Sequence, residues 1–141
     1  MARVTSVEIE QAVAATPDRV WTAWTTAEGL ATWWWPQIPD TSYAVDARVG
    51  GGYEIRSAAA GIGVRGSYSV VSAPDALAFT WVWLDGDEAL PADEVTVDLE
   101  PSGDGTRVVV RHLMTAADDG GAAYRQGWND VLGRLAALFA A

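Results

Sequence analysis

The amino-acid sequence predicts an α+β fold in which a curved antiparallel sheet of about six to seven strands surrounds one long C-terminal helix. Apolar residues at helical spacing occur in two short segments near the N-terminus and in one long segment at the C-terminus. Between them, residues 43–113 form short runs that alternate apolar and polar side chains and are separated by turn residues. Successive strands with short connections pair antiparallel and bury one face. We therefore expect the long helix to lie across the concave side of the sheet.

The first strand and a pair of short helices are expected near the N-terminus. Residues 6–13 alternate apolar and polar side chains, which is typical of a strand. A helix is expected over 17–25, because Thr16 is a preferred N-cap residue and a proline follows it. A second short helix is expected over 26–34, ended by Pro36. Two short helices in tandem form a compact corner rather than a crossover between parallel strands.

The remaining strands are expected in six runs, at residues 43–45, 53–57, 64–72, 77–83, 94–101 and 106–113. In the third of these runs the alternation places Gly66, Tyr68 and Val70 on one face. The acidic segment 85–92 is expected to be a polar loop.

The long C-terminal helix is expected over residues 121–141, after a linker over 114–121. Its apolar residues recur at the spacing of an amphipathic helix, namely at Tyr124, Trp128, Val131, Leu132, Leu135, Leu138 and Phe139. The opposite face is polar, and no proline interrupts the segment. This periodicity predicts that one face of the helix packs on the sheet.

Length and composition predict one domain spanning residues 1–141. A chain of 141 residues can bury roughly two-thirds of its unfolded surface, and half of its residues are apolar. The absence of cysteine excludes disulfides, thiol chemistry and cysteine-based metal sites. The net charge of −10, with arginine as the only basic residue type besides one histidine, disfavours binding to nucleic acid or to anionic lipid.

The sequence shows no sign of export or membrane insertion. Residues 1–10 alternate apolar and polar side chains and lack the apolar core of a signal peptide. The chain has no run of about 18 apolar residues of the kind that spans a membrane. We expect a cytoplasmic protein that acts without a membrane.

Several segments, taken in order, resemble the START-like helix-grip (SRPBCC) superfamily. They are residues 17–25 (PDRVWTAWT), 30–36 (LATWWWP), 51–53 (GGY), 66–68 (GSY), 79–81 (FTW), His112 and 127–128 (GW) ahead of Leu132 and Leu135. More narrowly, they resemble the branch named after the activator of Hsp90 ATPase. The likeness extends from about Val7 to Leu138, and it depends on the order and spacing of these segments together.

The resemblance implies a helix-grip fold with a deep apolar cavity between the curved sheet and the C-terminal helix. Such cavities in the superfamily hold lipids, sterols, plant hormones or polyketides, and some members are cyclases or aromatases. The branch name implies a chaperone-related or stress-response role. In the eukaryotic namesake that role also depends on a separate N-terminal domain, which the 141 residues do not include.

The side chains expected to face the helix form an apolar wall with a few polar groups. Together with two tryptophans of the short helical segments, the candidate ligand-binding residues are Trp24, Trp35, Tyr53, Ile55, Tyr68, Phe79, Trp81, Trp83, Val97, Val110, His112, Trp128 and Leu132. This composition is typical of a small-molecule pocket and equally of a solid core. Three consecutive rings, Trp33 to Trp35, cannot all be buried on one face of a short helix, so at least one is expected at a cavity mouth or a partner surface.

The single histidine, His112, is expected on the face beneath the helix. It could be a hydrogen-bonded core residue, a polar contact at the cavity floor or a general acid/base. No orienting carboxylate is evident in the sequence, so no catalytic residue is assigned. The acidic residues Asp85, Asp87 and Glu88 lack a known metal-ligand spacing, and no phosphate-binding loop occurs. We expect neither a metal nor a cofactor.

These observations favour a non-enzymatic domain that binds a small hydrophobic or aromatic molecule. Two alternatives remain open. One is a cyclase or dehydratase that uses His112, with Tyr53 or Tyr68 as a hydrogen-bond donor. The other is a chaperone-related protein-interaction module with an exposed apolar patch around residues 33–36. The sequence does not distinguish a monomer from a homodimer.

Overall fold

The computed structural model describes residues 5–114 and 121–140. Its three helices and eight strands are β1 (Thr5–Val13), α1 (Pro17–Thr25), α2 (Ala27–Trp33), β2 (Thr41–Val45), β3 (Gly52–Ser57), β4 (Ile62–Ser72), β5 (Ala76–Asp85), β6 (Glu88–Ala89), β7 (Asp93–Ser102), β8 (Gly105–Met114) and α3 (Ala122–Leu138). The linker expected over 114–121 lies for the most part outside the described residues.

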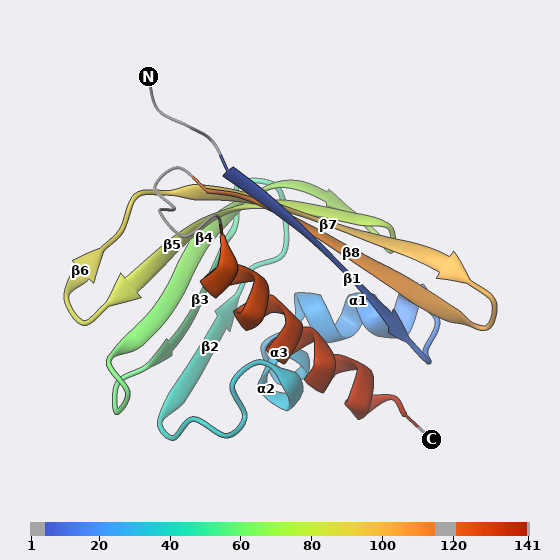
Figure 1. Cartoon of the computed structure of the whole chain (residues 1–141), viewed down its shortest axis with the longest axis horizontal. Helices are drawn as coiled ribbons and strands as arrows, with labels where there is room; N and C mark the ends of the chain where they lie inside the picture. The colour runs from blue at the N-terminus through green and yellow to red at the C-terminus, as the bar shows by residue number, and fades with distance from the viewer. Residues whose placement is uncertain (1–4, 115–120, 141) are drawn as a thin grey trace.

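The strands form one antiparallel sheet that curves around the helices, and this confirms the α+β helix-grip architecture (Figure 1). Its strand order is β1-β8-β7-β5-β4-β3-β2, so β1, although first in sequence, pairs with the last strand, β8. The acidic segment 85–92 is not entirely a loop, because the two-residue strand β6 within it pairs with the end of β5.

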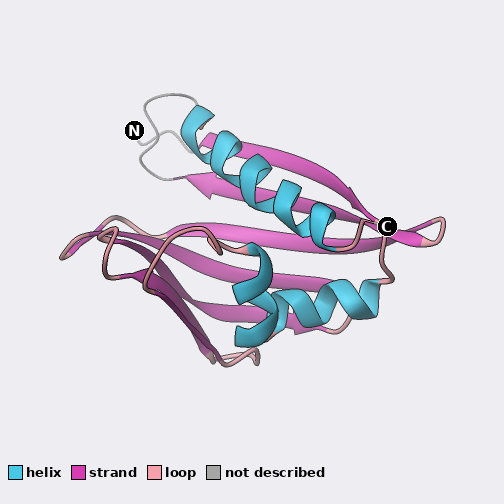
Figure 2. Cartoon of the chain, turned by 90° about the horizontal axis from the view of Figure 1, so that it is seen from below, coloured by secondary structure: helices cyan, strands magenta, loops and turns pink. Residues whose placement is uncertain are grey.

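All three helices lie on the same side of the sheet (Figures 1 and 2). Helix α3 crosses the sheet and contacts β1 and α2, while α1 contacts β7 and β8. The two short helices use different caps. The carbonyl of Thr16 accepts from the backbone N–H groups of the first turn of α1, but its side chain makes no capping bond. At α2, the Thr26 hydroxyl accepts from the Gly29 N–H at 2.9 Å, as expected for an N-cap.

The first turn of α3 requires a glycine at position 121. Gly121 is the N-cap residue and has a φ of +86°, a conformation that side chains rarely adopt. A Cβ atom there would also lie 2.6 Å from Val7 Cγ1. The glycine therefore allows α3 to begin directly against β1. Within the described residues, no helix is long and apolar enough to cross a membrane.

Strand β4 contains an irregularity that the alternation of the sequence did not predict. The register between β4 and β5 shifts between Tyr68 and Val70. As a result Val70 is 44% exposed, and its neighbour Val71 packs against the core instead. The expectation that Val70 shares the inward face of Tyr68 is therefore wrong, because an extra residue in a bulge exchanges the two faces of a strand.

Candidate functional site

A pocket of about 390 Å³ lies between the first half of α3, the chain that follows α2 and the strand β5. Its lining is almost entirely aromatic or aliphatic and consists of Trp34, Trp35, Trp81, Trp83, Leu90, Ala123, Tyr124, Gly127, Trp128 and Val131. Trp35, Trp83, Leu90 and Tyr124 are only partly buried, which places them toward the solvent side of the pocket. Such a concave and mostly apolar lining is typical of small-molecule sites.

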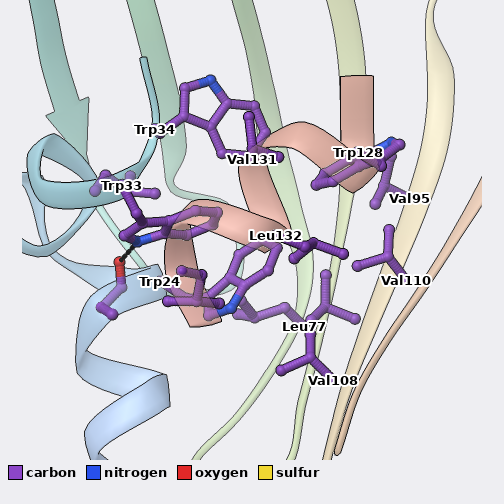
Figure 3. Packing of buried hydrophobic residues seen from close by; sticks show 14 of the residues in the cluster. Trp24, Trp33, Trp34, Leu77, Val95, Val108, Val110, Trp128, Val131 and Leu132 are labelled. Carbon is purple, nitrogen blue, oxygen red and sulfur yellow. Dashed lines mark hydrogen bonds between the residues drawn. The ribbon is translucent and has the colours of Figure 1, made fainter. Parts of the chain in front are cut away.

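The lining is continuous with a cluster of aromatic rings beneath it. Seven of the eight tryptophans contact another tryptophan ring, at centroid distances between 4.8 and 6.3 Å: Trp24, Trp33, Trp34, Trp35, Trp81, Trp83 and Trp128. Several of these contacts are edge-to-face, a favourable arrangement for aromatic pairs. Figure 3 shows the rings that α1, α2 and α3 contribute, and Trp81 joins this cluster to β5.

The end of helix α2 directs three consecutive indoles to different places. Trp33 is the last helical residue, is fully buried and donates from Nε1 to the Ala23 carbonyl at 2.9 Å (Figure 3). Trp34 is extended, with φ −93° and ψ 102°, and is 4% exposed. Trp35 has a φ of +55° and is half-buried. Because the backbone leaves the helix here, Trp34 and Trp35 both reach the pocket.

The structure divides the thirteen candidate residues into three groups. Trp35, Trp81, Trp83 and Trp128 line the pocket. Five others line a separate void of only about 20 Å³ and are otherwise packed together: Trp24, Tyr53, Ile55, Tyr68 and Phe79. The last four, Val97, Val110, His112 and Leu132, are fully buried and line neither space.

The open space is therefore confined to one end of the gap between helix and sheet. Rings from α1 and α2, especially Trp24 and Trp33, fill the remainder. Helical spacing alone could have identified Tyr124, Gly127 and Val131, which share a face of α3 with Trp128. No sequence signal indicated Leu90, which belongs to the segment expected to be a loop.

A broader hollow of about 570 Å³ lies over β2–β5 but is a weaker candidate. Apart from Tyr53 its lining side chains are half-buried or exposed, and they include the charged residues Asp46, Glu54 and Arg65. A shallow surface of this kind removes little of a ligand from water. We assign the candidate site to the smaller, aromatic pocket for this reason.

His112 lies next to the pocket in a chain of buried hydrogen bonds. Its Nε2 is 2.9 Å from Asp93 Oδ2, and the Trp128 indole N–H donates to its Nδ1 at 3.0 Å. An indole can only donate, so Nδ1 accepts and the ring proton resides on Nε2, which donates to the carboxylate. The chain connects β7, β8 and α3, with His112 fully buried and Asp93 5% exposed.

This arrangement keeps the imidazole neutral. Burial lowers the pKa of His112 below its ordinary value, and the hydrogen bond and negative charge of Asp93 oppose that effect to a smaller extent. Protonation at Nδ1 would also place two donors, His112 and Trp128, against each other. Both ring nitrogens are engaged and neither is exposed, so the group is arranged to anchor α3 rather than to exchange protons with a ligand.

Asp93 is the orienting carboxylate that the sequence analysis missed. A signal was present, because Asp93 shares the strand face of Val95, Val97 and Leu99, all of which are buried. In the register of β7 and β8, Val95 is opposite His112. Asp93 lies two residues before Val95 on β7, so its side chain is the next one on the same face of the sheet. A carboxylate in phase with three core residues indicates a buried polar partner.

We expect the stability of the protein to decrease as the pH falls below about 6.5. Because the pKa of His112 is lower in the folded than in the unfolded chain, the unfolded chain binds more protons between the two pKa values. The contribution of His112 to the free energy of unfolding is complete above its pKa in the unfolded chain. It is lost as the pH falls toward the pKa of His112 in the folded chain, by at most about 1.4 kcal/mol for each pH unit. Urea unfolding at pH 7.5, 6.5 and 5.5 measures the effect.

The matched control is His112→Gln, which removes the only histidine of the chain and therefore this titration. Its unfolding free energy should depend less steeply on pH than that of the wild type. Parallel curves for the two proteins would contradict the assignment. If the variant does not fold, the imidazole signals of the wild type, followed by NMR from pH 8 to pH 5, give the folded-state pKa directly.

The two tyrosines considered as hydrogen-bond donors are also buried. Tyr53 donates its hydroxyl to the Thr80 carbonyl at 2.8 Å. Burial, and then the neighbouring Tyr68, raise the pKa of Tyr53 above its ordinary value. Burial, and to a smaller extent Asp46, raise the pKa of Tyr68 to about 12. Both phenols stay neutral at physiological pH and lie outside the pocket lining. Among residues 5–114 and 121–140, no three carboxylate or histidine side chains converge as a metal site would require.

Comparison with known proteins identifies relatives of similar architecture. Residues 14–140 match the family described as "Activator of Hsp90 ATPase homolog 1-like protein". No curated protein sequence matches the chain. The structure of the Mll3558 protein from Rhizobium loti is 25% identical, with a TM-score of 0.82, over 97% of this chain and 98% of that one.

Two further structures share the fold at lower identity. DynU16, a protein of the dynemicin biosynthetic locus, is 22% identical with a TM-score of 0.79, over 94% of this chain and 46% of that one. PFC0360w, an HSP90 activator from Plasmodium falciparum, is 22% identical with a TM-score of 0.73, over 95% of both chains. At this identity the two matches support the fold alone.

Proposed function

Because the chain belongs to the Activator of Hsp90 ATPase homolog 1-like protein family, within the SRPBCC fold, we propose that it is a non-enzymatic binding domain for a small hydrophobic or aromatic molecule. The observation that carries the proposal is the pocket of about 390 Å³ beside α3 and its almost wholly apolar lining. A pocket of this size falls in the range of sites that enclose drug-sized ligands. The chain would act in the cytoplasm, in agreement with its composition.

The pocket surfaces match an aromatic ligand in particular. Trp35 and Trp83 lie edge to face at 5.8 Å at the partly exposed side, and Trp81 and Trp128 lie at 5.3 Å at the buried side. A flat ring between these indoles would add further stacked or edge-to-face contacts and remove apolar surface from water. The other candidate residues, such as Tyr68 and Leu132, are buried outside the pocket lining, and their direct contact with a ligand stays a prediction.

An enzymatic role for His112 has less support than binding. A general acid or base needs a free nitrogen within about 3 Å of the reacting proton. Asp93 and Trp128 occupy both nitrogens of His112, and the rings of Trp81, Tyr124 and Trp128 surround it. The proposal therefore assigns no catalytic residue.

Native mass spectrometry of gently purified protein tests the proposal. We expect a reproducible non-covalent adduct of a few hundred daltons, which would also reveal the class of the bound compound. The Trp83→Ala variant should lose the adduct, because Trp83 lines the pocket. Trp21→Ala is the matched control, since Trp21 is equally half-buried but lines none of the three hollows described above. Equal adducts in both variants would place the ligand elsewhere, and a bare protein that also fails to take up added aromatic probes would refute the proposal.

A second candidate is a chaperone-related protein-interaction module. The name of the family favours it. The apolar patch that this role predicts around residues 33–36 is small, however, because Trp33 and Trp34 are buried, Trp35 is half-buried and only Pro36 is exposed. Stimulation of a chaperone ATPase by the purified chain would support this role, and no effect at saturating protein would exclude it.

A further inference from the structure

We propose that the ligand of this pocket is a neutral, flat aromatic molecule that carries a carbonyl-type hydrogen-bond acceptor. This inference rests on the proposed binding function and specifies the chemistry of the same site. It starts from two indole nitrogens. Trp34 and Trp81 line the pocket and are only 4% and 5% exposed, and the Nε1 atom of each has no hydrogen-bond partner among the described residues.

Unpartnered buried donors are uncommon in folded proteins and call for an explanation. Neighbouring indoles show the usual arrangement, since Trp33 donates to the Ala23 carbonyl and Trp128 donates to His112. The Nε1 atom of Trp34 lies on the side of its ring that is turned away from Trp24 and Trp33 (Figure 3). All three unpartnered indoles, Trp24, Trp34 and Trp81, border the void of about 20 Å³, which is too small for an organic ligand, and only Trp34 and Trp81 also line the pocket.

The missing partner has to be an acceptor. An indole N–H donates and cannot accept, so a full hydrogen bond to Trp34 or Trp81 requires an oxygen or nitrogen lone pair, and the faces of neighbouring rings offer only a weaker contact. A bound ketone, quinone or ester would supply such an atom and would satisfy donors that are otherwise buried without a bond. A hydrocarbon would fill the same space but leave both donors unpaired.

The lining also selects against charge. None of the residues that line the pocket carries a carboxylate, guanidinium or imidazole. A charged ligand would lose its hydration there without gaining a counter-ion, which is unfavourable in an apolar site. The ring faces of the surrounding tryptophans favour a flat molecule that can stack against them.

Three probes that share one tricyclic ring system test this inference: 9-fluorenone, which has one carbonyl, fluorene, which has none, and fluorene-9-carboxylate, which is charged at neutral pH. Isothermal titration calorimetry on the full chain should give fluorenone an affinity about tenfold higher than fluorene, since one hydrogen bond made in an apolar site has an effect of this order. Fluorene-9-carboxylate should bind more weakly than either.

Variants assign the effect to the two indoles. In Trp34→Phe or Trp81→Phe the ratio of the fluorenone and fluorene affinities should fall toward one, because an N–H donor is removed while a ring remains. Trp35→Phe and Trp83→Phe are the controls, since they shorten partly exposed rings of the same pocket and should preserve the ratio. In wild-type protein, indole ¹⁵N–¹H spectra should show the Trp34 and Trp81 signals moving further downfield with fluorenone than with fluorene.

The possible outcomes distinguish a failure of the acceptor requirement from a failure of the proposed binding function. Equal affinities of fluorenone and fluorene, with no difference at the two indole signals, would overturn the acceptor requirement and leave the binding function intact. Absence of binding by all three probes would overturn both. The NMR comparison needs no substitution, so the inference stays testable even if Trp34→Phe or Trp81→Phe fails to fold.

Discussion

Replacing Trp128 by alanine should lower the free energy of unfolding by about 3–5 kcal/mol, the range for large aromatic residues removed from a core. Trp128 is 2% exposed and packs against the rings of Trp24, Trp34 and Trp81. The substitution also removes the hydrogen-bond donor to His112 Nδ1, which would leave a buried acceptor unpaired. Urea unfolding followed by far-ultraviolet circular dichroism at pH 7.5 measures the loss.

Trp128→Phe separates the two contributions. Phenylalanine keeps much of the ring packing but cannot donate to His112, so its cost should be clearly smaller than that of alanine. The same pair also tests binding, because Trp128 lines the pocket. If Trp128→Ala costs less than about 1 kcal/mol, the ring does not belong to a packed core, and the contacts of α3 described here are wrong.

Gly66→Val should destabilise the protein by about 3 kcal/mol or more, at the upper end of what overpacking costs. A Cβ atom at Gly66 would collide with the Thr80 carbonyl oxygen of β5 and would lie 2.9 Å from Tyr53 Cε1. Neither neighbour can retreat easily, since Tyr53 crosses above Gly66 and donates its hydroxyl to that same carbonyl. The clash is therefore with strand and tyrosine rather than with helix α3. Thermal unfolding gives the size of the effect.

Gly133→Ala is the control of opposite sign. Gly133 lies on the exposed side of α3, and a Cβ atom there would contact nothing within 4 Å. Alanine is a better helix former than glycine, so this variant should gain up to about 1 kcal/mol. An unchanged melting temperature in Gly66→Val would show that the register between β3, β4 and β5 is incorrect.

The pocket and the anchor of α3 share one residue, and this connects stability with binding. The indole of Trp128 donates to His112 and also lines the pocket. The two hydrogen bonds that join Asp93, His112 and Trp128 fix where α3 lies on the sheet, and so help to fix the contact between Trp128 and Trp81 at the buried side of the pocket. A preformed lining of this kind binds a flat ligand without the loss of entropy that ordering the lining side chains would require.

The sequence by itself determined the order and type of the elements, apart from the two-residue strand β6. Most strand runs alternate apolar and polar side chains, and the helix over Ala122–Leu138 keeps one apolar face. Prolines mark the first turn of α1 and the region after α2. These signals are local, because each depends on the period of one element and on residues that begin or end it. They also placed Val110 and His112 correctly on the face beneath α3.

The tertiary structure decided which inward side chains meet each other and where space remains. The bulge that turns Val70 outward depends on pairing with β5, and the pairing of Asp93 with His112 depends on the register of two strands. Alternation assigns a residue to a face but says nothing of the partner opposite it. Likewise, Trp34 and Trp35 reach the pocket only because the backbone leaves the helix after Trp33. Filled core and open pocket use the same apolar residues, so only the packing of the indoles in three dimensions separates them.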